Sequence, residues 1–379
     1  MKYKVTFYCP DRHIQYDGGR LPDTRGVGGG VNARIRLSQT LAQRGHNVTM
    51  ICNSIKDEVH LGVHYTPLDT EREITTDILI LTTSGGDLDL KPFLKLRTTS
   101  KLKILLLHGI PKPIGTDEIR PDFYYPPSNF IRHIMLTEWN NVPKGKIFVT
   151  HRGVMKKNFE STDPYLSALP RDKYRLAYIG HPSKGRKPAI EVLKLLQKID
   201  SRYHLFIFGD EQLWGSKAQA FKSIQGVKNF GLINQNELAN ELMQCRFGIF
   251  LQTRLEPYSN AMLESLSAGC IPIASPVGGY NEQIIPNWNG YFIDGHPDEP
   301  STWKKTENLI GRLQGDEELI NTIEKNARQS TYDWDVVARS WEEHWEVALN
   351  PAFPIPDHRY HQCHNCNNNT IEYSDGLHC

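Results

Sequence analysis

Two glutamates eight positions apart, Glu256 and Glu264, are the residues of this chain whose type and spacing most clearly suggest chemistry. The sequence predicts a strand that ends near residue 251, a loop that carries Glu256, and a helix that starts near residue 259 and carries Glu264. The backbone N–H groups of Ser259, Asn260 and Ala261 then lie at a helix N-terminus and suit a diphosphate. Two carboxylates beside a phosphate site fit a ligand with hydroxyls at both ends, such as a nucleotide sugar. Alternatively, Glu256 caps the helix and Glu264 pairs with a surface base.

A glycine-rich segment, residues 26–30, follows the first predicted strand and directly precedes a predicted helix. Glycines such as Gly29 and Gly30 let backbone N–H groups approach a phosphate at the positive end of a helix. An ordinary surface loop is the alternative interpretation. The segment is not a G-x-G-x-x-G fingerprint and the chain has no Walker Gly-Lys-Ser/Thr motif, so dinucleotide-binding and P-loop functions are disfavoured.

Two basic side chains complete the candidate chemistry. His108 ends a predicted strand of the first half, at the edge from which α/β sheets present ligands. A strand-end histidine bonded to neighbouring backbone is the alternative there. Lys184 belongs to a basic run, residues 184–187, that would normally be a solvated loop. Its place shortly after Gly180 favours contact with a phosphate.

The segment 357–379 holds a second candidate site, made of Cys363, Cys366, His378 and Cys379. The Cys-x2-Cys pair supplies half of a tetrahedral zinc site, which the last two residues would complete, with His361 as an alternative ligand. A tail with free thiols is the competing interpretation. The other four cysteines lie in apolar segments and are predicted to be small core residues, and the odd total of seven argues against a disulfide framework.

The composition narrows the class of protein. The 379 residues suggest two domains, and 44 basic against 43 acidic side chains give a net charge of +1. That charge gives no field that would favour nucleic acid or an anionic membrane. The longest apolar runs are far shorter than the roughly 18 residues of a membrane span, and the first ten residues do not form a signal peptide. We therefore expect a cytoplasmic protein, free or peripheral to a membrane.

Strands and helices are predicted to alternate, which is typical of parallel sheets covered on both faces. Strands are predicted at residues 3–9, 47–52, 76–81, 102–107, 132–136, 146–150, 174–179, 203–208, 227–230, 247–251 and 271–274. Helices are predicted at 31–44, 188–199, 236–243, 260–268, 316–328 and 334–349. Turn-forming residues between 156 and 173 separate two α/β halves.

Several of these segments together resemble a known family. Glu256-x7-Glu264, followed by Ala268-Gly-Cys-Ile-Pro272 and Gly278-Gly-Tyr-Asn-Glu282, is similar to the retaining nucleotide-sugar glycosyltransferases of GT-B fold, family 4. Further segments that resemble the family, in the expected order, are residues 28–30, 41–48, 146–154, 178–185, 208–210, 231 and 334–349. The resemblance implies an α/β fold of two Rossmann-like domains that face each other across a cleft.

The resemblance also implies domain boundaries. Residues 1–160 would form the N-terminal acceptor domain and residues 173–333 the nucleotide-sugar donor domain. Residues 334–350 would form a helix that packs back toward the first domain, and 357–379 would be an added Cys/His tail.

The resemblance assigns a role to each candidate residue. Glu256 would hold hydroxyls of the donor sugar, Glu264 the ribose hydroxyls and Lys184 the diphosphate, with His108 beside the transferred sugar. This chain has His181 where the family usually has an arginine. The remaining donor-binding candidates are Gly29, Gly30, Arg186, Gly209, Ser259, Asn260 and Ala261, and Lys187 is an alternative to Arg186 as the second cation.

The implied activity is retaining transfer of a hexose from a nucleoside diphosphate sugar to an acceptor hydroxyl, without a required metal ion. The sequence does not specify the acceptor, which can be a glycan, a lipid, a small molecule or a modified macromolecule. One alternative is a sugar-nucleotide epimerase of the same fold. Another is a nucleic-acid- or protein-binding module built on the tail, against which the net charge argues.

Overall fold

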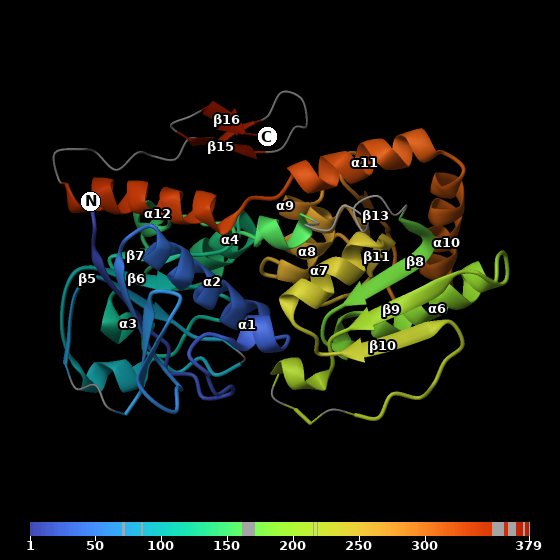
Figure 1. The fold of residues 1–379 in the computed structure, drawn as a ribbon. Coiled ribbons are helices and arrows are strands. Elements are labelled where there is room, and N and C mark those ends of the chain that lie inside the picture. Colours follow the sequence, from blue (N-terminus) through green and yellow to red (C-terminus); the bar gives the residue numbers. More distant parts are fainter. Residues whose placement is uncertain are drawn as a thin grey trace.

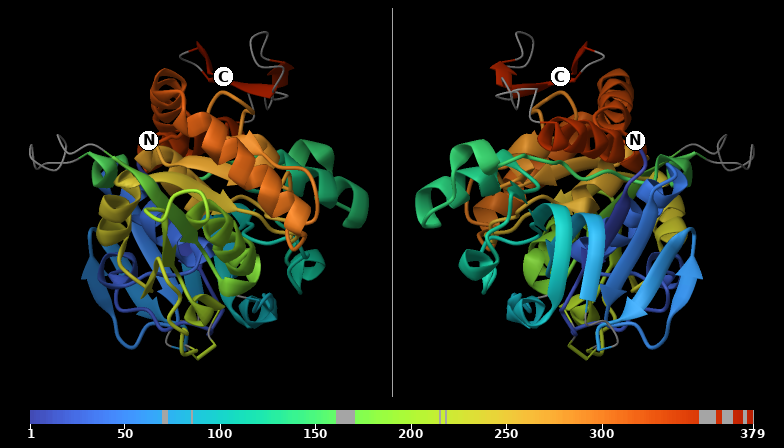
Figure 2. Two further views of the ribbon diagram at one scale, coloured as in Figure 1. Left: turned by 90° about the vertical axis from the view of Figure 1, so that its right-hand side faces the viewer. Right: turned by 90° about the vertical axis from the view of Figure 1, so that its left-hand side faces the viewer.

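The computed structural model describes residues 1–69, 73–84, 86–160, 171–214, 216–217 and 219–350, with the backbone of 360–362, 369–373 and 376–378. The body consists of two lobes that lie side by side, each built around one sheet (Figure 1). Figure 2 shows the molecule from its two ends, with the second lobe nearest the viewer on the left and the first lobe on the right.

The first lobe contains a seven-stranded sheet in the order β3-β4-β2-β1-β5-β6-β7. Its strands are β1 (Lys4–Tyr8), β2 (Asn47–Cys52), β3 (Glu58–His60), β4 (Val63–Pro67), β5 (Glu73–Thr82), β6 (Arg97–Leu106) and β7 (Phe123–Tyr125). Neighbouring strands run parallel except for β3, which pairs antiparallel with β4 at the edge. The largely apolar sequence of β1 and of the second halves of β5 and β6 suits central strands that are buried on both faces.

The second lobe contains a six-stranded, wholly parallel sheet in the order β10-β9-β8-β11-β12-β13. Its strands are β8 (Asp172–Ile179), β9 (His204–Phe208), β10 (Val227–Gly231), β11 (Cys245–Phe250), β12 (Ile271–Ala274) and β13 (Tyr291–Phe292). Because successive side chains of a strand point to opposite faces, Leu176 and Tyr178 enter one hydrophobic core and Ala177 and Ile179 another.

Helices cover both sheets. The α-helices are α1 (Leu21–Thr24), α2 (Gly29–Gln43), α3 (Thr116–Ile119), α4 (Asn129–Glu138), α6 (Arg186–Gln197), α7 (Gln235–Met243), α8 (Asn260–Ala268), α9 (Tyr280–Gln283), α10 (Pro300–Gln314), α11 (Glu317–Gln329) and α12 (Trp334–Leu349). Short 3-10 helices are η1 (Lys91–Lys95), η2 (Lys144–Lys146), η3 (Lys156–Phe159), η4 (Pro182–Lys184) and η5 (Glu211–Trp214). The structure describes no helix that is both long and apolar enough to cross a membrane.

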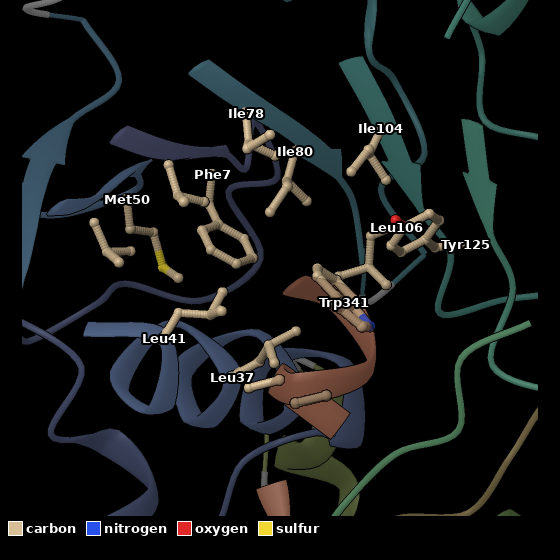
Figure 3. Close-up of a cluster of buried hydrophobic side chains, with 14 of the residues drawn as sticks. Phe7, Leu37, Leu41, Met50, Ile78, Ile80, Ile104, Leu106, Tyr125 and Trp341 are labelled. Carbon is tan, nitrogen blue, oxygen red and sulfur yellow. The ribbon is translucent and has the colours of Figure 1, made fainter. Parts of the chain in front are cut away.

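Helix α12 follows the second lobe in sequence but packs on the first. Trp341 lies in the core of the first lobe, between Leu37 of α2 and the strands that carry Leu106 and Tyr125 (Figure 3). The Trp341 and Tyr125 rings meet edge to face at 4.8 Å between centroids. Burial of such large aromatic surfaces holds α12 against the first sheet.

The segment around residues 132–136, predicted as a strand, is part of helix α4. The Ser128 hydroxyl accepts a hydrogen bond from the backbone N–H of Ile131 and caps this helix. Ile131, Ile134 and Met135 are buried, at the i, i+3, i+4 spacing of one helix face. The five residues 132–136 hold only three apolar side chains, too few to distinguish a period of 2 from one of 3.6, and the strand prediction was wrong.

The predicted strand at 146–150 is also wrong. This segment begins in η2 and makes a single bridge, from Ile147 to Tyr124, beside β7. Strands β3 and β4, the short edge strand β7 and helix α10 were not predicted.

The tail contains three short antiparallel strands, β14 (Tyr360–Gln362), β15 (Asn369–Tyr373) and β16 (Gly376–His378). Cys363, Cys366 and Cys379 lie outside the described residues, and of His378 only the backbone is described. Zinc binding by the tail therefore stays a prediction.

Candidate active site

A cavity of about 560 Å³ lies between the two lobes, at the carboxyl ends of both parallel sheets. Open α/β sheets bind ligands at this edge. The first lobe contributes His108, which follows β6, and Arg152. The second lobe contributes Lys184 after β8, Glu256 after β11, and Glu264 from α8.

Lys184 and Glu256 form an ion pair in this cavity. The Lys184 Nζ lies 2.7 Å from Oε2 of Glu256. Glu256 is buried, whereas the Lys184 side chain is about a quarter exposed to the cavity. A buried carboxylate paired with one amine keeps free lone pairs for further donors, and the amine keeps N–H groups for an anion.

Two glycine turns place this pair. Gly185 has a φ of +106°, and its Cα packs so closely on the Leu251 carbonyl that a Cβ would lie 2.0 Å from that oxygen. Gly278 packs on the backbone of Glu256, and the Gly279 N–H donates to the Glu256 carbonyl at 2.6 Å. The glycine pair at 278–279 therefore holds the loop that carries Glu256.

The N-terminus of α8 points into the cavity and contacts the first lobe. The Ser259 hydroxyl accepts from the N–H of Met262 and caps the helix, while Asn260 and Ala261 line the cavity. The Asn260 side chain donates to the Gly29 carbonyl of α2 at 3.1 Å and accepts from Arg152 at 3.0 Å. Helix-end N–H groups in this position suit a diphosphate.

Glycines 28–30 bring the first lobe close to this helix. Helix α2 starts at Gly29, so these glycines form a helix start rather than a preceding loop. A Cβ on Gly30 would lie 2.8 Å from Ser84 and 3.2 Å from His108. The close approach of α2 to the ends of β5 and β6 thus requires glycine at position 30.

His108 is partly buried beside Arg152. Nη2 of Arg152 lies 3.3 Å from Nδ1 of His108, and Nε2 of His108 has no hydrogen-bond partner within the described residues. Burial, reinforced by the Arg152 charge, holds the pKa of His108 well below its usual range. Because a guanidinium only donates, the ring is neutral with its proton on Nε2. It can donate that N–H to a hydroxyl in the cavity.

Glu264 lies on the side of α8 that faces α7. Burial raises the pKa of its carboxyl to about 7, although a hydrogen bond from Gln235 and the charge of Arg36 lower it. The Gln235 amide donates to Oε1 of Glu264 at 3.1 Å. The second carboxylate oxygen remains available for ligand hydroxyls.

An aromatic and cationic cluster that the sequence did not predict lines the second lobe's side of the cavity. Trp214 stacks on His181 at 3.7 Å between ring centroids, and the Arg254 guanidinium lies 4.7 Å from the Trp214 ring centre. Arg254 lines the cavity and has no carboxylate partner in the described part of the chain. Its place two residues before Glu256 was the available sequence signal.

The predicted site residues divide into two groups. Those that line the cavity are Gly29, Gly30, His108, Lys184, Gly209, Glu256, Ser259, Asn260, Ala261 and Glu264. Arg186 does not line it, because its guanidinium lies 3.5 Å from Glu211 and over the Phe221 ring. Arg152, Arg254 and Gln235 line the cavity but were not among the predicted donor-binding residues.

Known proteins resemble this chain in sequence and in fold. Residues 167–330 match the family model described as glycosyl transferases group 1. An uncharacterised glycosyltransferase from Methanocaldococcus jannaschii is 23% identical over 244 residues, which are 61% of this chain and 64% of that relative. A glycosyltransferase structure from Rickettsia africae has a TM-score of 0.65 at 14% identity, over 92% of this chain and 99% of that chain. Anabaena Alr3699/HepE in complex with UDP-glucose has a TM-score of 0.62 at 16% identity, over 90% and 98%.

These matches confirm the predicted α/β fold with two parallel-sheet lobes, as in GT-B glycosyltransferases. The match to the glycosyl transferases group 1 model falls on the second lobe. The chain spans 64% of the length of the curated relative that it matches, so the activity of the whole protein is a matter for proposal.

Proposed function

We propose that this protein transfers a sugar from a nucleoside diphosphate sugar to an acceptor hydroxyl, with retention of configuration at the anomeric carbon. The observation that carries the proposal is one cavity in which the Lys184–Glu256 pair, the N-terminus of α8 and Glu264 lie together. These groups offer, respectively, contacts for sugar hydroxyls, a positive site for a diphosphate and an acceptor for ribose hydroxyls. The group 1 domain and the likeness to a protein solved with UDP-glucose support a nucleotide-sugar donor.

The proposed reaction exchanges one bond at the anomeric carbon. The bond to the diphosphate oxygen breaks, and the acceptor oxygen bonds to the same carbon from the same face, while its proton passes to the departing phosphate. Lys184 and the α8 N-terminus stabilise the charge that develops on the leaving group. Glu256 and the neutral His108 position the sugar from opposite lobes.

The function is tested by ligand-induced stabilisation. We expect a rise in melting temperature with one of UDP, GDP, ADP or dTDP, and turnover of the matching sugar nucleotide. NMR of the product then reports the anomeric configuration. If no sugar nucleotide stabilises the protein or is consumed, the proposal fails. An inverted product would overturn retention, and conversion of the donor sugar to its epimer without an acceptor would favour the epimerase alternative.

Arg254 is proposed as the second cation for the diphosphate. Replacing it with methionine keeps an apolar stem against Trp214 but removes a charge that has no carboxylate partner among the described residues. Loss of one charged hydrogen bond predicts roughly tenfold weaker binding of a nucleoside diphosphate, measured by calorimetry, with the free nucleoside unaffected. Arg202→Met is the matched control, because Arg202 is exposed and pairs with Asp200. Equal loss for diphosphate and nucleoside would contradict this role.

Transfer is proposed to need no divalent cation, because Lys184, Arg254 and a helix N-terminus already supply positive charge where the diphosphate would lie. We expect turnover with EDTA to stay within about twofold of turnover without it. Activity that EDTA abolishes and Mg²⁺ or Mn²⁺ restores would contradict this prediction. Restoration by Zn²⁺ alone would instead implicate the tail.

A further inference from the structure

A chain of side chains runs from the first lobe to Glu264 in the second. Arg36 of α2 is buried. Its Nε and Nη2 donate to the side-chain amide oxygen Oε1 of Gln235 on α7, at 2.9 and 2.7 Å. The Gln235 amide nitrogen then donates to Oε1 of Glu264 on α8, at 3.1 Å. Residues 36 and 235 are 199 positions apart in sequence, and their contact joins the two lobes.

The order of donors and acceptors fixes which way the Gln235 amide points. A guanidinium has only N–H donors, so the amide must turn its oxygen toward Arg36 and its NH₂ toward Glu264. Arg36 is itself held by Asp23 of α1, at 2.5 Å, and by Gln39 of α2, at 3.2 Å. Arg36 therefore dictates that Glu264 receives an N–H donor rather than a second oxygen.

We propose that Arg36 and Gln235 are positioning residues that present an N–H donor to the Glu264 carboxylate and so orient it for a ribose diol, which lets the first lobe contribute to nucleotide binding from a distance. This inference rests on the proposed function, since it requires a ribonucleotide in the cavity. Neither residue needs to touch the nucleotide for this effect.

The electrostatics of α8 support the inference. Burial raises the pKa of Glu264 to about 7, and the Gln235 donor and the Arg36 charge oppose that rise. Charged groups on the other elements packed against α8 have partners of their own: Glu237 and Glu241 on α7, Glu282 on α9, Glu324 and Arg328 on α11, and Lys156 on η3. A protonated Glu264 accepts ribose hydroxyls less strongly, so nucleotide affinity falls as the pH falls through this pKa. Without Arg36 or the Gln235 donor the pKa rises, and the fall begins at a higher pH.

The test compares two variants of the full chain, Arg36→Met and Gln235→Glu. The second keeps an ion pair with Arg36, which protects the fold, but turns an oxygen toward Glu264. Affinities for UDP, GDP and ADP and for their 2′-deoxy counterparts are measured between pH 6 and 9. We expect each variant to bind the preferred ribonucleotide roughly tenfold more weakly at pH 7.5. The pH at which nucleotide affinity begins to fall should be higher by about one unit in each variant. The 2′-deoxynucleotide should lose little.

Arg44→Met is the matched control, because Arg44 directly follows helix α2, which carries Arg36, but pairs with Glu342 and Asp335 of α12 instead of with Gln235. It should leave both affinity and pH profile unchanged. Equal weakening of ribo- and deoxynucleotide, or an unmoved pH profile, would overturn the inference and leave only a structural role. If Glu264→Ala weakened ribonucleotide binding but neither Arg36→Met nor Gln235→Glu did, the inference would be overturned while the proposed function would stand. If the unmodified protein binds dTDP but none of the three ribonucleotides, the inference fails while the proposed function stands; if it binds none of the four, both fail.

Discussion

Replacing Glu256 with glutamine is expected to lower kcat/KM for sugar transfer by about 10²–10³-fold, while affinity for the bare nucleoside diphosphate changes less than about threefold. The amide has the shape of the carboxylate but lacks the charge that would bind sugar hydroxyls. Glu256 also neutralises Lys184 at 2.7 Å. In the variant that lysine is freed for the diphosphate, so binding of a ligand without sugar should not suffer.

The two ligands separate the proposed role of Glu256 from general damage. Calorimetry with the diphosphate and kinetics with the intact donor are measured on the same preparation. Glu241→Gln is the matched control, because Glu241 lies on α7 of the same lobe and pairs with Arg175. It should leave both quantities unchanged. If Glu256→Gln weakened diphosphate binding as much as transfer, Glu256 would belong to the nucleotide site instead.

The helices that the sequence predicted best are those whose first and last residues are set by local capping residues. The predicted helix at 260–268 has the bounds of α8, since Ser259 caps its start and Gly269, with φ +72°, ends it. The helix at 334–349 likewise has the bounds of α12, which Asp333 caps. Where a segment was short, as at 132–136, the local pattern of apolar residues did not distinguish strand from helix, whereas the Ser128 cap marks the start of α4.

Some residues of the candidate site could be predicted from local motifs and others could not. Glu256, Glu264 and Lys184 belong to short motifs, so their presence at one edge of the second sheet could be predicted. Arg152 and Gln235 could not be, because each matters through a contact with a residue about 100 to 200 positions away. Such contacts depend on how the two lobes meet, which no local pattern encodes.

The Lys184–Glu256 ion pair was also not predictable from the spacing of the residues, because it depends on the close contact of two backbone segments that are far apart in sequence. Gly185 lies against the Leu251 carbonyl, so that the turn carrying Lys184 and the loop carrying Glu256 are held together. From the sequence, Gly185 is identified only as part of a segment that resembles the family. Its physical role is evident once the two segments are seen in contact.

Gly185→Ala is therefore expected to have the largest effect on stability of any substitution considered. A Cβ there would lie 2.0 Å from the Leu251 carbonyl oxygen and 3.0 Å from its carbon, and both are backbone atoms that cannot rotate away. The φ of +106° adds strain for any residue with a side chain. Conformational strain and overpacking together predict a loss of about 3 kcal/mol or more in the free energy of unfolding, measured by urea denaturation.

Two other glycines separate the causes of that loss. Gly180 also has a positive φ, of +144°, but a Cβ there would meet only the Tyr178 hydroxyl at 3.9 Å, so Gly180→Ala isolates the conformational strain. Gly311 lies within α10 with nothing near it, and Gly311→Ala should stabilise the protein by about 0.5–1 kcal/mol. If Gly185→Ala cost no more than Gly180→Ala, the close approach to Leu251 would not be what holds Lys184 against Glu256. A Gly185→Ala protein that folds should still show the local effect, because moving the turn separates Lys184 from Glu256 and weakens diphosphate binding and transfer together.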